Sequence, residues 1–123
     1  MSRVAIVGSR RFPELERVEK YVQELPPLTR LVTGSASGVD AAAARAARRR
    51  GLALQILSAS FEELKDPSLA AARNQRLIDQ CDSLVAFWDG ASTGTRATID
   101  RALDSGREVH VFVCPAPVRL VSS

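Results

Sequence analysis

Three short segments of the 123-residue chain combine glycine with serine, threonine or arginine in a way that suits the binding of a phosphate. Their sequences are GSRR at 8–11, GSASGVD at 34–40 and DGASTGT at 89–95. Glycine lets the backbone approach a ligand closely. A helix that begins in such a segment points its free N–H groups and its positive dipole end at a bound anion. We therefore predict that these segments surround one phosphate, or the two ends of a larger ligand.

Two of the segments also have a purely structural interpretation. Ser37 and Asp40 have the spacing of a capping box, and Thr95 is a candidate N-cap residue, so both segments could simply begin capped helices. The glycine spacings match neither GxxxxGK[ST] nor GxGxxG, which excludes a Walker loop and a standard dinucleotide fingerprint. Because the hydroxyl groups favour anion binding, the predicted ligand-binding residues are Gly8, Ser9, Arg10, Gly34, Ser35, Ala36, Gly38, Asp40, Arg73, Asn74, Gly90, Ser92, Thr93, Gly94 and Thr95.

Arginine is the residue type best suited to clamp a phosphate at this site. Arg10 follows an apolar run directly and is predicted to contact the ligand, whereas Arg11 is expected to point to solvent. Arg73 and Asn74 fall early in a predicted helix, from which an arginine can reach the same edge of the sheet. Arg73 is also a candidate catalytic residue, although a surface salt bridge suits it equally well. Trp88 could stack on a base.

Acid–base and metal chemistry have little support in the sequence. Asp40 and Asp89 are the other candidate catalytic residues, since each carboxylate lies in a glycine-containing segment. The only histidine, His110, has strand spacing within EVHVFV and is interpreted as a strand residue. Cys81 and Cys114 belong to no cluster of metal-ligating residues and are interpreted as small, buried or half-buried side chains. We therefore expect neither a metal site nor a cofactor.

Apolar runs alternate with helical patterns along the chain and must position these residues. Strands are predicted at 3–7, 30–33, 52–57, 83–88 and 108–113, and helices at 13–25, 38–50, 68–80 and 95–105. Strands separated by helices pair in parallel through right-handed crossovers. The predicted fold class is therefore α/β, a three-layer Rossmann-like domain with a five-stranded, mainly parallel sheet. Ligands of such sheets bind beyond the carboxyl ends of the strands, where the strand order reverses.

One domain over residues 1–114 and a flexible tail over 115–123 are expected, and the composition of 46% hydrophobic and 25% charged residues is that of a globular protein. No apolar stretch approaches the roughly 20 residues of a membrane span, and the N-terminus lacks the features of a signal peptide. We therefore expect a cytoplasmic protein without a membrane partner.

The charge pattern favours a nucleotide or nucleic acid as the partner. The net charge is +3, and all of the 17 basic residues except Lys20 and Lys65 are arginine, which suits bidentate phosphate contacts. The run RAARRR at 45–50 is interpreted as a solvated helix face, with a nucleic-acid patch as the alternative.

Four segments in the same order resemble the SLOG superfamily: VAIVGSRRF, LVTGSASGVDAAAARAA, RNQRLID and DSLVAFWDGASTGTRATIDRA. The resemblance covers roughly residues 3–113 and is greatest to the small YspA/YpsA-related members, with DprA/Smf and LOG proteins as more distant relatives. It implies a Rossmann-like fold, a site for a nucleotide or nucleotide derivative at the segments described above, and self-association into a homodimer.

The resemblance to LOG enzymes, which hydrolyse the N-glycosidic bond of nucleoside 5′-monophosphates, is incomplete. Arg73, Gly90 and the Gly-Thr pair at 94–95 match their signature. The position of the signature glutamate, whose carboxylate is expected to support the oxocarbenium charge, is occupied by Thr98. Asp100 is turned about 200° around the helix from that position and does not replace it. The resemblance therefore implies phosphate binding, but the chain lacks at this position the carboxylate that hydrolysis needs.

DprA-like members carry a GxAxGxD segment and bind single-stranded DNA, and Gly34, Ala36, Gly38 and Asp40 match that segment. Other SLOG domains sense nucleotide-derived signals. The function that we expect is binding of a nucleotide or nucleoside-phosphate derivative at the carboxyl edge of the sheet, as a sensor or accessory protein. The alternatives are a phosphoribohydrolase-like N-glycosidase that acts on nucleoside monophosphates, and DprA-like binding of single-stranded nucleic acid.

Overall fold

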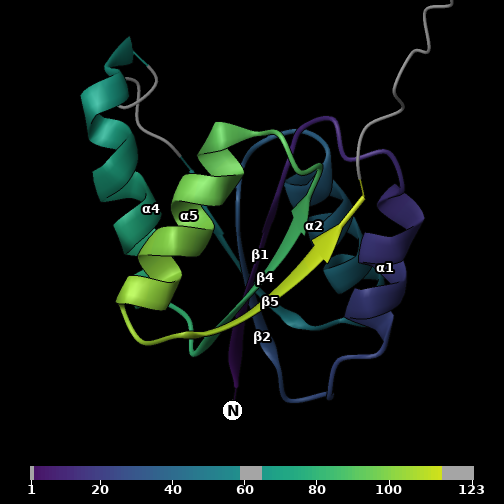
Figure 1. Ribbon diagram of the computed structural model, residues 1–123. Helices are drawn as coiled ribbons and strands as arrows, with labels where there is room; N and C mark the ends of the chain where they lie inside the picture. The colour runs from purple at the N-terminus through teal and green to yellow at the C-terminus, as the bar shows by residue number, and fades with distance from the viewer. Residues whose placement is uncertain (1, 59–64, 115–123) are drawn as a thin grey trace, which may run out of the picture.

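The computed structural model describes residues 2–58 and 65–114, and within them five strands form one sheet (Figure 1). The strand order is β3-β2-β1-β4-β5, and every neighbouring pair is parallel. The strands are β1 (Arg3–Gly8), β2 (Arg30–Gly34), β3 (Ala53–Leu57), β4 (Ser83–Trp88) and β5 (Glu108–Val113).

Helices cover both faces of this sheet. One face carries α1 (Leu15–Gln23) and α2 (Val39–Arg50), and the other carries α4 (Ala70–Asp79) and α5 (Thr93–Asp104). A short 3-10 helix, η1 (Pro67–Leu69), precedes α4. The predicted three-layer, Rossmann-like α/β fold is therefore confirmed, and the sheet, predicted to be mainly parallel, is parallel at each of its pairings.

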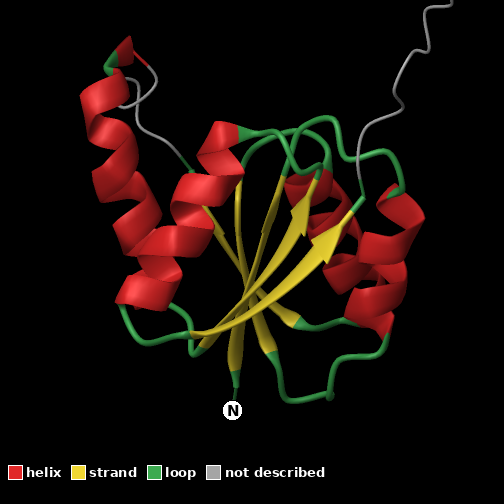
Figure 2. Ribbon diagram, viewed as in Figure 1, coloured by secondary structure: helices red, strands yellow, loops and turns green. Residues whose placement is uncertain are grey.

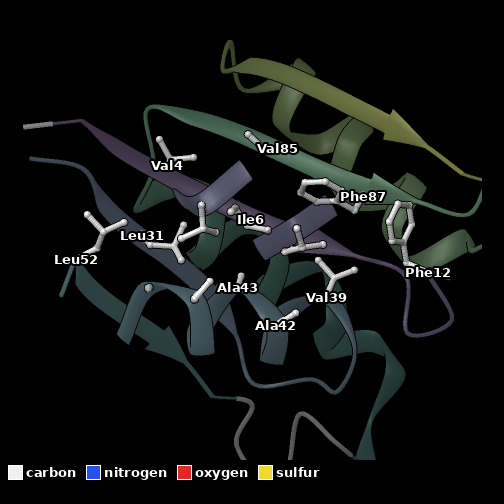
Figure 3. Close-up of a cluster of buried hydrophobic side chains, with 14 residues drawn as sticks. Val4, Ile6, Phe12, Leu31, Val39, Ala42, Ala43, Leu52, Val85 and Phe87 are labelled. Atoms are coloured by element: carbon white, nitrogen blue, oxygen red, sulfur yellow. The ribbon is translucent and has the colours of Figure 1, made fainter. Parts of the chain in front are cut away.

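The central strands supply both layers of the core because successive side chains of a strand point to opposite faces. Val4 and Ile6 of β1 pack toward α1 and α2, whereas Ala5 packs toward α4 and α5. In β4, Phe87 belongs to the first cluster (Figure 3) and Ala86 to the second. Strands buried on both faces read as continuous apolar runs, which is why the sequence marks them clearly.

The observed bounds differ from the predicted ones mainly at the helices. Each strand agrees to within one residue, and the differences include the terminal glycines Gly8 and Gly34, whose backbones continue the pairing. The first helix begins at Leu15 rather than at residue 13 and ends at Gln23. The helix predicted at 68–80 starts as η1, and α5 starts at Thr93 rather than at residue 95.

The predicted flexible tail at 115–123 and the connection at 59–64 lie outside the described residues. Among the helices that are described, none has both the length and the apolar character needed to cross a membrane.

Candidate functional site

The strand order reverses between β1 and β4, and the connections that leave these two strands run to opposite faces of the sheet. Such a reversal leaves a crevice at the carboxyl edge. The loops that follow β1, β2 and β4 gather at this edge (Figure 2). A cleft of about 1310 Å³ opens there and continues between α4 and α5, because residues of both helices line it.

Most of the predicted ligand-binding residues line this cleft. They come from all three glycine-containing segments and from the second turn of α4: Gly8, Arg10, Gly34, Ser35, Ala36, Asp40, Arg73, Asn74, Ser92, Gly94 and Thr95. Asp89, predicted as a candidate catalytic residue, also lines it. Four predicted residues do not: Ser9, Gly38, Gly90 and Thr93.

Ser9 and Gly38 do not line the cleft themselves but contact residues that do. The Ser9 hydroxyl is buried, accepts a hydrogen bond from Asp89 N at 3.1 Å and lies 3.3 Å from Thr95 Oγ1. Gly38 has φ +78°, and a Cβ added there would lie 2.8 Å from the carbonyl oxygen of Arg10. The turn before α2 thus needs glycine to pack against the loop after β1.

Three arginines of the loop after β1 and of α4 border the cleft, namely Arg10, Arg11 and Arg73, and a fourth, Arg101 of α5, lines it as well. Arg11 is exposed, as predicted, and it also borders the cleft. In the part of the chain that the structure describes, none of the three side chains makes a hydrogen bond or a salt bridge. The surface salt bridge considered for Arg73 is therefore not formed there, and these guanidinium groups remain available to an anion.

The loop between β4 and α5 is held by the carboxylate of Asp89. Its Oδ1 accepts hydrogen bonds from Ala91 N at 2.9 Å and Ser92 N at 2.7 Å. These bonds, that from Ser92 foremost, lower the pKa of Asp89 below its usual value. An anionic carboxylate already engaged by two backbone donors is suited to ordering the loop, which is a different role from the catalytic one that we considered.

Residues of the first turn of α5 line the cleft. The N-cap residue of this helix is Ser92 rather than the predicted Thr95, and the Ser92 side chain makes no capping bond. The hydroxyls of Ser92 and Thr95 instead lie 3.3 Å apart. Gly94 lines the cleft, and within 4 Å of a Cβ built on it there is nothing from the described residues outside its own helix. The first N–H groups of an α-helix lack intrahelical partners, so this turn offers an open anion site.

Asp40 closes the opposite side of the cleft. Its Oδ2 accepts a hydrogen bond from Ala36 N at 3.2 Å. The capping box predicted for Ser37 and Asp40 is therefore wrong, because α2 has Gly38 as N-cap without a side-chain bond. The carboxylate turns back into the loop because Gly34 leaves room for it: a Cβ there would lie 2.7 Å from Oδ2.

Burial raises the pKa of Asp40 to about 6. The bond from Ala36 N, the Thr33 hydroxyl and the charges of two cleft arginines act in the opposite direction without cancelling this effect. Near neutral pH the group therefore accepts hydrogen bonds, such as one from a sugar hydroxyl, and it is also protonated readily.

Thr98 occupies the position where LOG enzymes carry their glutamate, and it does line the cleft. Its hydroxyl donates to the carbonyl oxygen of Gly94 at 3.1 Å. Asp100 borders the extension of the cleft along α5, where Arg96 lies 3.8 Å from it. The motif position itself thus offers a hydroxyl engaged with its own helix.

Other candidate groups lie away from the cleft lining. The Trp88 indole N–H donates to the carbonyl oxygen of Ser92 at 2.9 Å, so Trp88 braces the loop and does not present its ring to the cleft. His110 is an exposed strand residue whose Nε2 lies 2.9 Å from Glu108 Oε1. Cys81 is buried and Cys114 half-buried, as predicted. Among the residues described, no group of His, Cys, Asp and Glu could hold a metal ion.

The sequence did not predict the part of the cleft between α4 and α5. Arg101 of α5 donates to Gln75 of α4 at 3.3 Å, and both residues line the cleft. On α5, lining residues occur at positions 94, 95, 97, 98, 100, 101 and 104, and most of them have the spacing of one helix face. That spacing is visible in the sequence, but it does not reveal which neighbour the face meets.

No protein-family model and no curated protein matches the chain. Among solved structures, the fold is similar to that of DNA processing protein A (DprA) from Streptococcus pneumoniae, with a TM-score of 0.75 and 23% sequence identity. The match covers 90% of this chain and 50% of the other, so this chain spans about half the length of that neighbour. At this identity the similarity establishes the fold, and the function must be argued from the cleft.

Proposed function

We propose that the cleft binds a nucleotide or nucleoside-phosphate derivative through its phosphate group. The observation that carries this proposal is the first turn of α5, where the space beside Gly94 is open and the first backbone N–H groups lack intrahelical partners. This turn faces a cleft that Arg10, Arg11 and Arg73 border, and among the described residues their side chains make no hydrogen bond or salt bridge.

The remaining lining fits the rest of a nucleotide. The cleft is larger than the roughly 300–1,000 Å³ of a common small-molecule pocket, so a phosphate alone would leave most of it empty. Val7 and Leu57 add apolar surface for a base, and Asp40 can accept a hydrogen bond from a sugar hydroxyl. Phosphate, sugar and base thus each have a suitable neighbour.

Binding without turnover is the form that we favour. Hydrolysis of an N-glycosidic bond needs a carboxylate beside the sugar, and Thr98 takes the place where LOG enzymes carry theirs. The Asp89 carboxylate is engaged in its loop. A role as a sensor or accessory protein of the SLOG type, which the sequence resembles, agrees with a cleft that holds a ligand and lacks this group.

Binding of single-stranded nucleic acid is a second candidate, favoured by the similarity to a structure described as a DNA processing protein. The same phosphate site would then hold one backbone phosphate. A ligand that tracks several phosphates loses affinity steeply as salt rises, and this salt dependence separates a strand from a free nucleotide.

The experiment is a thermal-shift titration with the four nucleoside 5′-monophosphates, ribose 5-phosphate and inorganic phosphate. A nucleotide at 100 times its Kd should add about 2.7 kcal/mol to the free energy of unfolding. Arg73→Ala should abolish the shift. Arg76→Ala is the matched control, because Arg76 lies in the same helix and does not line the cleft.

If none of these compounds raises the melting temperature of the wild-type protein, the proposal is wrong. Chromatography of the incubated monophosphates tests turnover in the same samples. Free base in the wild-type sample, but not in the Arg73→Ala sample, would replace binding by hydrolysis as the function.

A further inference from the structure

The arginines of the RAARRR run on α2 divide into two pairs with different surroundings. Arg49 forms a salt bridge with Glu19 of α1, with 2.6 Å between Nη2 and Oε1. Arg50 Nη1 donates to the carbonyl oxygens of Val22 and Leu25, at 2.8 Å and 2.6 Å. This pair therefore fastens α2 to α1 and the turn that follows it.

The other pair, Arg45 and Arg48, lines a groove of about 250 Å³ between α2 and the edge strand β3. Both side chains are exposed, and within residues 2–58 and 65–114 neither makes a hydrogen bond or a salt bridge. The groove positions on α2 are 40, 41, 44, 45 and 48, which lie along one helix stripe. Alanines at 41 and 44 leave the two guanidinium groups uncovered.

This groove is continuous with the cleft. Four residues line both of them, namely Gly34, Ser35, Ala36 and Asp40. A ligand held in the cleft that extends over the loop after β2 would therefore reach the groove along α2.

The order of groups along this path is cationic, carboxyl, cationic. The cleft supplies Arg10 and Arg73, Asp40 follows, and the groove supplies Arg45 and Arg48. Along the helix axis, Arg45 lies about 7.5 Å and Arg48 about 12 Å beyond Asp40. Guanidinium groups bind phosphate through paired N–H donors, and a carboxylate between them would repel a phosphate while accepting from a hydroxyl.

We propose that the Arg45/Arg48 groove is a second phosphate subsite, so that the preferred ligand is a nucleoside with phosphate on both its 5′ and 3′ sides. This inference rests on the proposed function, because the first phosphate occupies the cleft. The same chemistry is present in a free nucleoside 3′,5′-bisphosphate and in one unit of a single strand. Ile56, 37% exposed, gives the groove an apolar wall for the adjoining sugar or base.

The inference is tested by calorimetric titration of the full chain with three ligands: AMP, adenosine 3′,5′-bisphosphate and a ten-nucleotide oligoadenylate. The bisphosphate should bind wild-type protein about tenfold or more tightly than AMP does. Arg45→Gln/Arg48→Gln should reduce bisphosphate affinity to that of AMP and leave AMP affinity unchanged. Lys20→Gln/Arg30→Gln is the matched control: it removes the same charge from two exposed positions outside both hollows and should change neither affinity.

Equal affinities for AMP and the bisphosphate, or a double variant that binds the bisphosphate as the wild type does, would overturn the second subsite and leave the proposed function intact. Failure of the wild-type protein to bind any of the three ligands would overturn both the second subsite and the proposed function.

Tighter binding of the oligoadenylate than of the bisphosphate would identify a strand as the source of the two phosphates. In that case the double variant should lower the slope of log affinity against log salt by about 0.7 for each phosphate that the protein no longer neutralises. Equal affinities for the oligoadenylate and the bisphosphate would identify the free nucleotide as the source of the two phosphates.

Discussion

Helix stability alone does not explain why position 94 is a glycine. Alanine is more favourable than glycine within a helix by about 1 kcal/mol, and a Cβ at this position would meet nothing within 4 Å. The φ of Gly94 is not in the left-handed region either, since the glycines with positive φ are Gly38, Gly51, Gly90 and Gly106. The open space beside Gly94 is where we propose that the ligand lies.

Gly94→Ala should separate stability from binding. We expect the free energy of unfolding to stay constant or rise by up to about 1 kcal/mol, while nucleotide affinity falls at least about tenfold because the new methyl group meets the ligand. Urea denaturation and calorimetric titration measure the two quantities. Thr93→Ala, in the same turn but outside the cleft lining, is the control and should bind normally. Unchanged affinity of Gly94→Ala would place the phosphate elsewhere.

Asp40 should give the protein a distinctive dependence of stability on pH. Its pKa is about 6 in the folded protein against 3.8 ordinarily, so between these values the folded protein holds a proton that the unfolded chain releases. The stabilisation is complete below pH 3.8 and is lost as the pH rises through about 6. Relative to Asp40→Asn, whose amide stays neutral, wild-type protein should lose about 1–3 kcal/mol of unfolding free energy between pH 4 and pH 7.

Urea denaturation of both proteins at four pH values from 4 to 7 measures this difference. Asp66, Asp82 and Asp89 have lowered pKa values and act in the opposite direction, but they are common to both proteins and cancel in the comparison. Parallel stability profiles would show that Asp40 titrates normally.

At the scale of elements, the β4–α5 loop depends on the acceptor oxygen of Asp89 more than on its charge. Asp89→Ala removes the acceptor of two backbone bonds and should lower the free energy of unfolding by about 1–2 kcal/mol, together with nucleotide affinity. Asp89→Asn retains an acceptor oxygen and should largely keep both. Urea denaturation and titration of the two variants test this. An Asn variant as damaged in binding as the Ala variant would return Asp89 to a direct role with the ligand.

The strands and their order of appearance could be predicted from the sequence because β1 and β4 are buried on both faces and read as unbroken apolar runs. Helix starts were harder, because caps depend on contacts from distant residues. The Asp40 side chain bonds Ala36 N instead of capping α2, and the room for it comes from the missing Cβ of Gly34. Local spacing carries no information about that space.

The site was predictable where it consists of loops and not where it consists of packed helices. The gathering of these segments at the carboxyl edge follows from parallel pairing, which the alternation of strands and helices already indicates, whereas the strand order comes from the structure. The contact of Arg101 with Gln75 depends on how α5 lies on α4. The division of the α2 arginines likewise depends on where α1 and β3 flank that helix.

At the scale of the whole molecule, α2 and α4, which lie on opposite faces of the sheet, differ in how many of their residues are buried. Six residues of α2 are buried, namely Val39, Ala42, Ala43, Ala44, Ala46 and Ala47, whereas α4 buries Leu77 and Ile78. Local opening is easier where fewer apolar groups are buried. The side of α4 that lines the cleft carries Arg73 and Asn74, so part of this helix is held by few contacts until a ligand occupies the cleft.

Ligand binding should therefore slow amide hydrogen exchange in α4 more than in the other layer. Without ligand, we expect α4 to exchange faster than α2, because opening it exposes less apolar surface. A bound phosphate that contacts Arg73, Arg10 and the first turn of α5 links α4 to two other elements, and opening of α4 must then break those contacts as well. Exchange followed by mass spectrometry, with and without nucleotide, measures this effect, with α1 as the internal reference because it lies on the opposite face. In Arg73→Ala the added protection of α4 should disappear. Equal slowing of α1 and α4 would mean that the ligand stabilises the fold globally rather than through the cleft, since only a contact made by α4 itself can protect that helix selectively.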